Sequence, residues 1–315
     1  MRKYDFKAIP IINYFYRLSL VVYIFAETFD CHFKKYVQDN VFEYGLLRDV
    51  VIITANALKL HYCHHIQSAV ALDVDKIRSH LYVLDAGYEE CYPKIVIYDL
   101  KVYKTVQQTE LLGVNGSDVS TLVVDARPLK GETRVFMGSK LGGYITVFDP
   151  GEGSWHRVAL NCAEETDVPS EFLAISKFQL LIYFTSTQSN NMYSVPLRDL
   201  RNLTSYMKPS IQSDDFFGQL KARCLGEKLG TSKGLYVDIY GGINYVYARD
   251  FAAVRWIPSM GLSAEGHKVL LQSRNKLPAV TKILADSSYL QVWAINEKPD
   301  SDYQRFTVRI NSLTF

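Results

Sequence analysis

Four aspartates stand at the ends of apolar segments and could supply carboxylate chemistry: Asp85, Asp99, Asp125 and Asp149. Asp85 and Asp125 could approach one another if a common axis gathers the strand ends, and such a pair can act as general acid and base. An aspartate directly after a strand more often accepts hydrogen bonds from the backbone amides of a tight turn. We favour the turn role and assign no catalytic residue.

The residues His61, Cys63, His64 and His65 are of types that bind metal ions. Successive side chains of a strand point to opposite faces, so only His61, Cys63 and His65 could share one face. No second group of ligands follows at a metal-binding spacing, and we predict no metal site. The sequence also lacks Gly-x-Ser-x-Gly, P-loop and His-Glu-x-x-His motifs, so we expect no cofactor.

The composition is typical of a folded chain, and the charge gives no sign of a strongly charged partner. Of 315 residues, 48% are hydrophobic and 22% are charged, and the formal net charge is +2. This provides apolar material for a sizeable core, while Lys and Arg are dispersed along the chain. We therefore expect no nucleic-acid partner. No apolar run reaches the length of about 18 residues that a membrane-spanning helix requires, so we expect a chain that does not span a membrane.

The first 26 residues have the pattern of a secretory signal peptide. A basic start is followed by the apolar run 18–26 (LSLVVYIFA), which ends on the small residue Ala26. The alternative is a buried strand or helix of the domain. Two glycosylation sequons, at Asn115 and Asn202, agree with an exported glycoprotein. We predict a signal peptide at 1–26 and a secreted, extracellular protein.

From residue 68 onward the chain repeats a unit of short apolar strands separated by turns. Such a period predicts the blades of a β-propeller, an all-β fold. We expect residues 31–67 to form an abbreviated or irregular first blade, which makes six blades and a single domain over 27–315. Residues 199–204 are expected to form a short helical turn, and 214–225 have mixed helical character. The strands nearest the axis are expected at 68–74, 120–126, 172–176, 234–239 and 281–286.

The order of several segments resembles the major royal jelly protein and yellow family of insects. The resemblance covers roughly residues 68–297, and the family fold is a six-bladed β-propeller, in agreement with the repeats. The segments that carry it are Asp75–Gly87 (DKIRSHLYVLDAG), Cys91–Leu100 (CYPKIVIYDL), Val123–Asp125 (VVD), Gly142–Asp149 (GGYITVFD), Ser154–Trp155, Asn191–Asn202 (NMYSVPLRDLRN) and Leu225–Ser232 (LGEKLGTS).

The resemblance implies a ligand site at one end of the propeller axis. Members that bind biogenic amines use a Thr and an Asn that match Thr281 and Asn296, whose oxygens can accept hydrogen bonds. The alternative is that both residues only cap strand ends. An aromatic residue that follows in such binders is replaced here by Lys298, which favours an anionic or neutral ligand over an amine.

Two disulfides of the family are missing in this sequence. Ile77 or a neighbour stands where the family has a Cys, and Arg255 stands where it has another. The expected partners are also absent, so each pair is lost as a whole. Of the five cysteines, Cys91 and Cys162 are candidates for a new bridge, although the sequence leaves the connectivity open.

The resemblance supports three functional hypotheses. The first is a secreted binding or structural protein for small aromatic ligands of the catechol or indole type, in cuticle, pigmentation or eggshell. The second is an isomerase that converts dopachrome in melanin synthesis, which requires a positioned acid and base. The third is a degenerate duplicate without a ligand. We favour the non-enzyme hypothesis.

Overall fold

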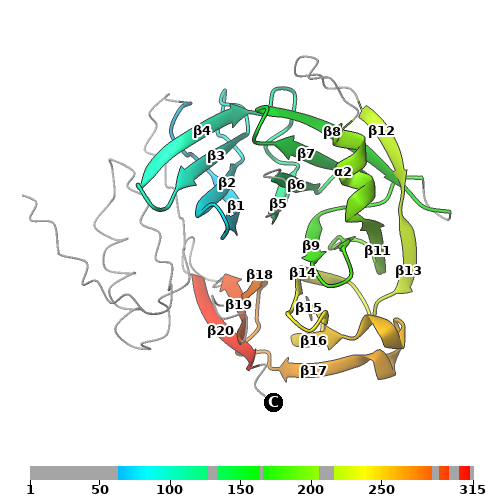
Figure 1. Cartoon of the computed structure of the whole chain (residues 1–315). Helices are drawn as coiled ribbons and strands as arrows, with labels where there is room; N and C mark the ends of the chain where they lie inside the picture. Colours follow the sequence, from blue (N-terminus) through cyan, green and yellow to red (C-terminus); the bar gives the residue numbers. More distant parts are fainter. Residues whose placement is uncertain are drawn as a thin grey trace, which may run out of the picture.

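Five β-sheets surround a common axis and form a β-propeller (Figure 1). The computed structural model describes residues 63–126, 133–163, 166–205, 216–285, 291–297 and 305–312. The prediction of an all-β propeller is confirmed for this part of the chain. The predicted signal peptide and most of the predicted additional blade lie outside the described residues, so the sixth blade stays a prediction.

The first two sheets begin with the strands closest to the axis, as the repeat predicts. The first sheet contains β1 (Ala69–Asp75), β2 (His80–Asp85), β3 (Lys94–Asp99) and β4 (Lys104–Glu110). The second contains β5 (Val119–Asp125), β6 (Arg134–Ser139), β7 (Tyr144–Asp149) and β8 (Ser154–Asn161), with β12 (Phe216–Lys221) added at its outer edge.

The remaining sheets follow the same order from the axis outward. The third contains β9 (Phe172–Ser176), β10 (Leu181–Thr185), β11 (Asn191–Pro196) and β13 (Arg223–Glu227). The fourth contains β14 (Ser232–Val237), β15 (Ile243–Tyr247), β16 (Ala252–Trp256) and β17 (His267–Gln272), and the fifth contains β18 (Val280–Ala285), β19 (Gln291–Glu297) and β20 (Arg305–Ser312). The axial strands lie within two residues of their predicted positions.

The core lies between neighbouring sheets. Middle strands such as β6, β10 and β15 are buried on both faces because the second, third and fourth sheets pack against a sheet on either side. Their near-continuous apolar sequences are typical of strands covered on both sides. Three apolar clusters fill the successive layers, with Phe136, Tyr193 and Tyr245 among their largest buried side chains.

A two-strand segment, 216–227, ties the second sheet to the third. Strand β12 pairs in parallel with β8, and β13 then pairs antiparallel with β11 of the next sheet. We call residues 216–227 the strap. A disulfide between Cys162, which follows β8, and Cys224 in β13 holds it in place. The predicted helical character of 214–225 is wrong for the described residues, because the segment completes two sheet edges instead.

The cysteine pairing corrects the candidate bridge between Cys91 and Cys162. Cys91 is bonded to Cys63, and Cys162 is bonded to Cys224. Each bridge joins segments that are near in space only after the sheets have formed, which is why the sequence could not indicate the partners.

Helix α2 (Leu197–Ser205) confirms and extends the helical turn predicted at 199–204. Its Arg201 forms a two-pronged ion pair with Asp125 at the end of β5, with N–O distances of 2.6 Å and 2.6 Å. Leu197 and Leu200 of the same helix are buried. The helix therefore covers the ends of strands in two sheets.

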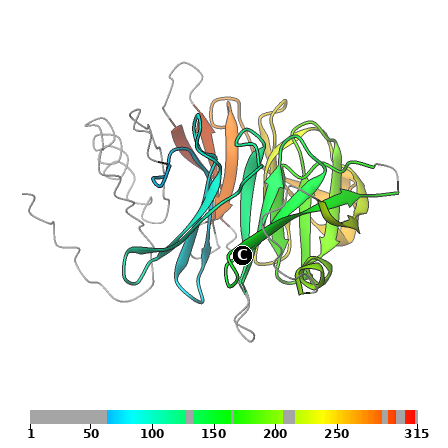
Figure 2. The same cartoon turned by 90° about the horizontal axis from the view of Figure 1, so that it is seen from above.

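The propeller has two different ends, because its axial strands run in the same direction. At their beginnings, the hydroxyl of Ser120 donates to the carbonyl of Glu171; at their ends, the amide of Val124 donates to the carboxylate of Asp73. We call the end where the axial strands begin the entry face and the opposite end the exit face. Figure 2 shows the strands from the side, with α2 on the exit face.

Candidate functional site

The structure brings Thr281 and Asn296 together on the entry face. In the fifth sheet Val280 pairs with Asn296 and Lys282 pairs with Ile295, which leaves Thr281 as the extra residue of a β-bulge. Bulges redirect a side chain and are common beside functional sites. The Thr281 hydroxyl donates a long hydrogen bond, 3.4 Å, to the carbonyl of Ile295.

Asn296 is fully buried and only half of its amide is satisfied. Its Nδ2 donates to the carbonyl of Lys276 at 3.1 Å, while its Oδ1 has no hydrogen-bond partner among the described residues. Leaving a buried acceptor unpaired costs about 1–3 kcal/mol. The arrangement therefore offers an acceptor that a hydroxyl, an indole N–H or an ammonium group of a ligand could use.

The same end of the fifth sheet approaches the first sheet. Lys282 Nζ donates a hydrogen bond to the carbonyl of Val70, which lies at a bulge in β1. This contact joins residues that are far apart in the described chain and places a positive charge between the fifth and first sheets. The predicted third residue of the site, Lys298, lies outside the described residues.

Asp85 occupies the position in the first sheet that Asn296 occupies in the fifth. It pairs with Ala69 at the beginning of β1, as Asn296 pairs with Val280 at the beginning of β18. Its carboxylate accepts from the amides of Gln67 and Ser68 at 3.0 Å and 2.6 Å. Asp85 is thus fully engaged where Asn296 retains an unused acceptor.

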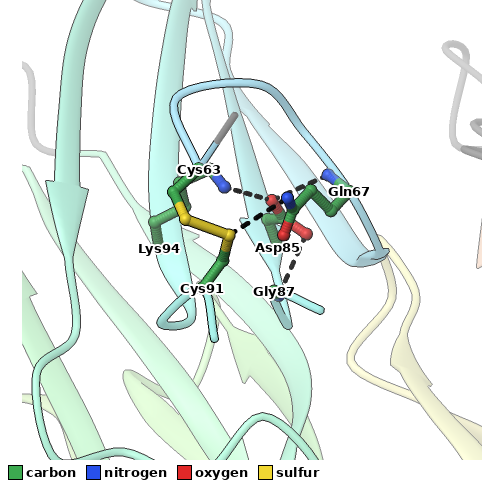
Figure 3. Close-up of a disulfide and its surroundings, with 6 residues drawn as sticks. All are labelled: Cys63, Gln67, Asp85, Gly87, Cys91 and Lys94. Carbon is green, nitrogen blue, oxygen red and sulfur yellow. Dashed lines mark hydrogen bonds and ion pairs between the residues drawn. A yellow bond between two sulfur atoms is a disulfide. The ribbon is translucent and has the colours of Figure 1, made fainter. Parts of the chain in front are cut away.

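A buried ion pair and a disulfide surround Asp85 (Figure 3). The Nζ of Lys94 lies 2.7 Å from the Asp85 carboxylate, and both side chains are inaccessible to solvent. The Cys63–Cys91 bridge lies beside this pair, and Gln67 Nε2 contacts Cys91 Sγ at 3.1 Å. These contacts fasten the segment that enters β1 to the connection between β2 and β3.

The other aspartates of the predicted set also have structural partners. Asp99 accepts from the amide of Lys101 at 2.7 Å, and Asp149 accepts from the amide of Gly151 at 2.8 Å. Asp149 also forms an ion pair with Arg134 at 2.9 Å. Asp125 is held by Arg201 of α2. The geometry agrees with the turn and pairing roles.

The predicted absence of a metal site is not contradicted by the described residues. Cys63 is in a disulfide and cannot bind a metal ion as a thiolate. Within the described ranges, no three His, Cys, Asp or Glu side chains are arranged to hold an ion. His61 lies outside those ranges.

A buried lysine on the entry face was missed by sequence reasoning. Lys228 is 4% exposed, and its Nζ donates to the hydroxyls of Thr185 and Ser232 at 2.6 Å and 2.7 Å. Burial lowers the pKa of Lys228 to about 7, although the charge of Glu171 opposes this effect. The lysine links the end of β10 to the beginning of β14 and so joins the third and fourth sheets.

The two predicted glycosylation sequons are placed on the surface. Asn115 is exposed in a turn, and its Oδ1 accepts from the amide and hydroxyl of Ser117 at 3.0 Å and 2.9 Å. Asn202 is exposed on α2. No helix in the described part of the chain is long and apolar enough to cross a membrane.

The five sheets arranged around one axis define a β-propeller. The chain belongs to the major royal jelly protein family, whose model matches residues 67–311. This confirms the resemblance seen in the sequence.

Two curated relatives from Apis mellifera are similar at low identity. Major royal jelly protein 3 is 22% identical over 272 residues, which are 78% of this chain and 48% of that protein. Major royal jelly protein 6 is 22% identical over 249 residues, which are 72% of this chain and 56% of that protein. The chain thus spans about half the length of the curated relatives it matches.

A solved structure supports the fold alone. A chain in the crystal structure of a nidogen/laminin complex aligns with a TM-score of 0.53 and 13% identity, covering 77% of this chain and 76% of its own length.

Proposed function

We propose that this protein is a secreted, extracellular binding protein that holds a small aromatic ligand of the catechol or indole type at Thr281 and Asn296. The observation that carries the proposal is the buried Oδ1 of Asn296, which lacks a donor in the described structure. A phenolic hydroxyl or an indole N–H would supply that donor. Membership of the family agrees with such a role in cuticle, pigmentation or eggshell.

Charge favours a neutral or anionic ligand over an amine. Lys282 is the neighbour of Thr281 in β18, and Lys298 follows Asn296 by two positions in the sequence. A cation at the site would repel an ammonium group and attract a carboxylate. The ligand class is therefore an aromatic ring with a hydrogen-bond donor and no positive charge.

The enzymatic alternative, a dopachrome isomerase, requires an acid and a base at the ligand. Asp85 and Asp125, the pair considered for that task, are each engaged in an ion pair with a basic side chain. This favours binding over catalysis. The third alternative, a degenerate duplicate, is disfavoured by the continuous packing between the described sheets.

Secretion and glycosylation are part of the proposal. Disulfides persist mainly in oxidising compartments, and the described residues contain two. Cleavage after Ala26 would release a chain over 27–315. Asn115, exposed in a turn, would carry a glycan, and mass spectrometry of the secreted chain would detect both modifications.

Thermal unfolding with a ligand panel tests the binding proposal. Dopamine, serotonin, octopamine, dopachrome and the anionic indole-3-acetate are added separately to the purified chain. A ligand that binds the native state raises the Tm by mass action, and we expect the largest shift with indole-3-acetate.

Matched variants locate the binding site. Thr281→Val preserves shape and should abolish the shift, whereas Thr109→Val on the outer strand β4 should retain it. Asn296→Leu provides a second test, with its own Tm measured without ligand to detect any loss of folding. A shift that survives both entry-face substitutions would contradict the proposed site, and no shift with any ligand would contradict the binding function.

A further inference from the structure

The exit face presents exposed apolar side chains near the axis. They lie on three turns that connect axial strands to second strands, namely 76–79, 177–180 and 238–242. We call these the exit turns. Their exposed apolar residues are Ile77 (51% exposed), Phe178 (83%), Leu180 (56%), Ile239 (48%) and Tyr240 (48%).

The exit turns are neighbours around the propeller axis. A Cβ on Gly241 would lie 3.8 Å from the ring of Phe178, so the turns of the third and fourth sheets adjoin. Burial raises the pKa of Asp73 and is the largest effect on it. The charges of Lys177 in the third sheet and Lys76 in the first sheet both lower this pKa. Two lysines from different sheets thus lie near one partly buried carboxylate.

The backbone conformation of residue 180 in the second exit turn disfavours a large apolar side chain. Leu180 has φ 56°, in the left-handed region that glycine and asparagine adopt most readily. Tyr103, at φ 55°, repeats this on the turn between β3 and β4 and is 73% exposed. Both positions hold large side chains that are strained in the backbone and largely exposed to water.

The solvent-exposed charges on the exit turns are positive. Lys76 and Lys177 are exposed, and Arg78 is partly exposed while paired with the buried Asp75. Asp238, the acidic residue within these turns, is buried and paired with Arg255 at 2.6 Å. The solvent-facing residues of the three turns are therefore apolar, neutral or basic.

We propose that the exit face docks on a lipid surface that carries anionic headgroups. Aromatic and aliphatic tips would enter the boundary between headgroups and acyl chains, and the lysines would contact the headgroups. A protein partner would need a continuous complementary area, whereas separate projecting tips suit a fluid surface. The proposal concerns the end of the propeller opposite Thr281 and Asn296 and does not depend on the ligand.

Vesicle sedimentation tests the proposal with the full secreted chain. Phosphatidylcholine vesicles with and without phosphatidylserine are mixed with the protein and pelleted. We expect binding only with phosphatidylserine, and we expect it to fall as salt rises. Lys177→Gln should weaken vesicle affinity about fivefold, the factor expected for one lysine near an anionic surface.

The variant Leu180→Asn separates binding from folding. Asparagine tolerates the backbone of residue 180 better than leucine, so the Tm should stay the same or rise while vesicle binding falls. Phe178→Ser should also weaken binding. The matched control is Leu141→Ser, which removes a leucine that is 74% exposed on the connection between β6 and β7 at the entry face and should leave binding unchanged.

Three outcomes would overturn the proposal. The first is no sedimentation with phosphatidylserine vesicles, and the second is equal loss of binding in Leu141→Ser and Leu180→Asn. The third is a dimer, detected by light scattering without lipid, that Phe178→Ser dissociates; the exit face would then bind a second copy of the chain.

Discussion

At the scale of single residues, Lys228 shows how a buried cation is accommodated between two sheets. Two hydroxyls replace the carboxylate that usually accompanies a buried ammonium group. Its pKa of about 7 lies well below the ordinary value of 10.5 because burial disfavours the charged form. The native state therefore releases this proton at a lower pH than the unfolded chain does.

This difference predicts a pH-dependent stability. Below pH 7 both states are protonated and the native state bears the full desolvation penalty. Between pH 7 and 10.5 the unfolded chain binds the extra proton, so Lys228 makes the native state more stable as pH rises. Thermal unfolding of the wild type and Lys228→Met across this range checks the sign. The difference in Tm between them should change with pH, and a constant difference would contradict the assignment.

His156 should act in the same direction at lower pH. Burial lowers its pKa to about 4 from 6.5, so its contribution to stability is lost as pH falls through this interval. The pH dependence of the free energy of unfolding should therefore be less steep between pH 6.5 and 4 in His156→Gln than in the wild type. Equal slopes in the two proteins would contradict this.

The candidate site residues differ in how far the sequence could reveal them. Thr281 and Asn296 were found by resemblance, and their spacing in the chain agrees with their meeting across one strand pair. The unused acceptor of Asn296 depends on its burial and on the position of Lys276, which no local pattern encodes. Lys228 stands in a polar run and had no signal that distinguished it from a surface lysine.

At the scale of elements, the strap explains how an edge strand is protected. An unpaired edge strand is a site for aggregation. Strand β12 pairs in parallel with β8 and so covers the edge that β8 would otherwise expose. The amide of Ala222 also donates to the carbonyl of Asn161 at 2.6 Å, where β8 ends. The sequence of 214–225 lacks strict alternation, so its pairing with two different sheets was not predictable from periodicity.

Removing the Cys162–Cys224 bridge should loosen this element first. A disulfide of this kind stabilises by about 2–4 kcal/mol, so Cys162→Ser with Cys224→Ser should lower the Tm by several degrees. Hydrogen exchange should accelerate in β12 and β13, with β16 of the fourth sheet as the internal control. Unchanged protection in the strap would contradict its dependence on the bridge.

Two arginines form polar contacts at the turns where the resemblance implies cysteines. Arg255 forms bonds of 2.6 Å and 3.1 Å with Asp238, and a Cβ on Gly242 would clash with its guanidinium. Near Ile77, the side chain of Arg78 donates to the hydroxyl of Thr133 at 2.6 Å. Polar contacts thus connect these turns to neighbouring strands in the absence of the two family disulfides.

At the scale of the whole molecule, the repeat made the five described blades predictable. The second strands of the first four sheets are almost wholly buried, which produces the apolar runs that the sequence shows. The strap and the disulfides link different blades, and such links leave no periodic signal. The family model matches residues 67–311, and the described residues within this range form the five blades.

A crystal structure of the chain with indole-3-acetate would test the central claim most directly. The binding proposal predicts difference density for the ring on the entry face, with its N–H within hydrogen-bond distance of Asn296 Oδ1 and its carboxylate towards Lys282. Density at another location under saturating ligand, or an empty entry face, would contradict the assignment of Thr281 and Asn296 as the binding site.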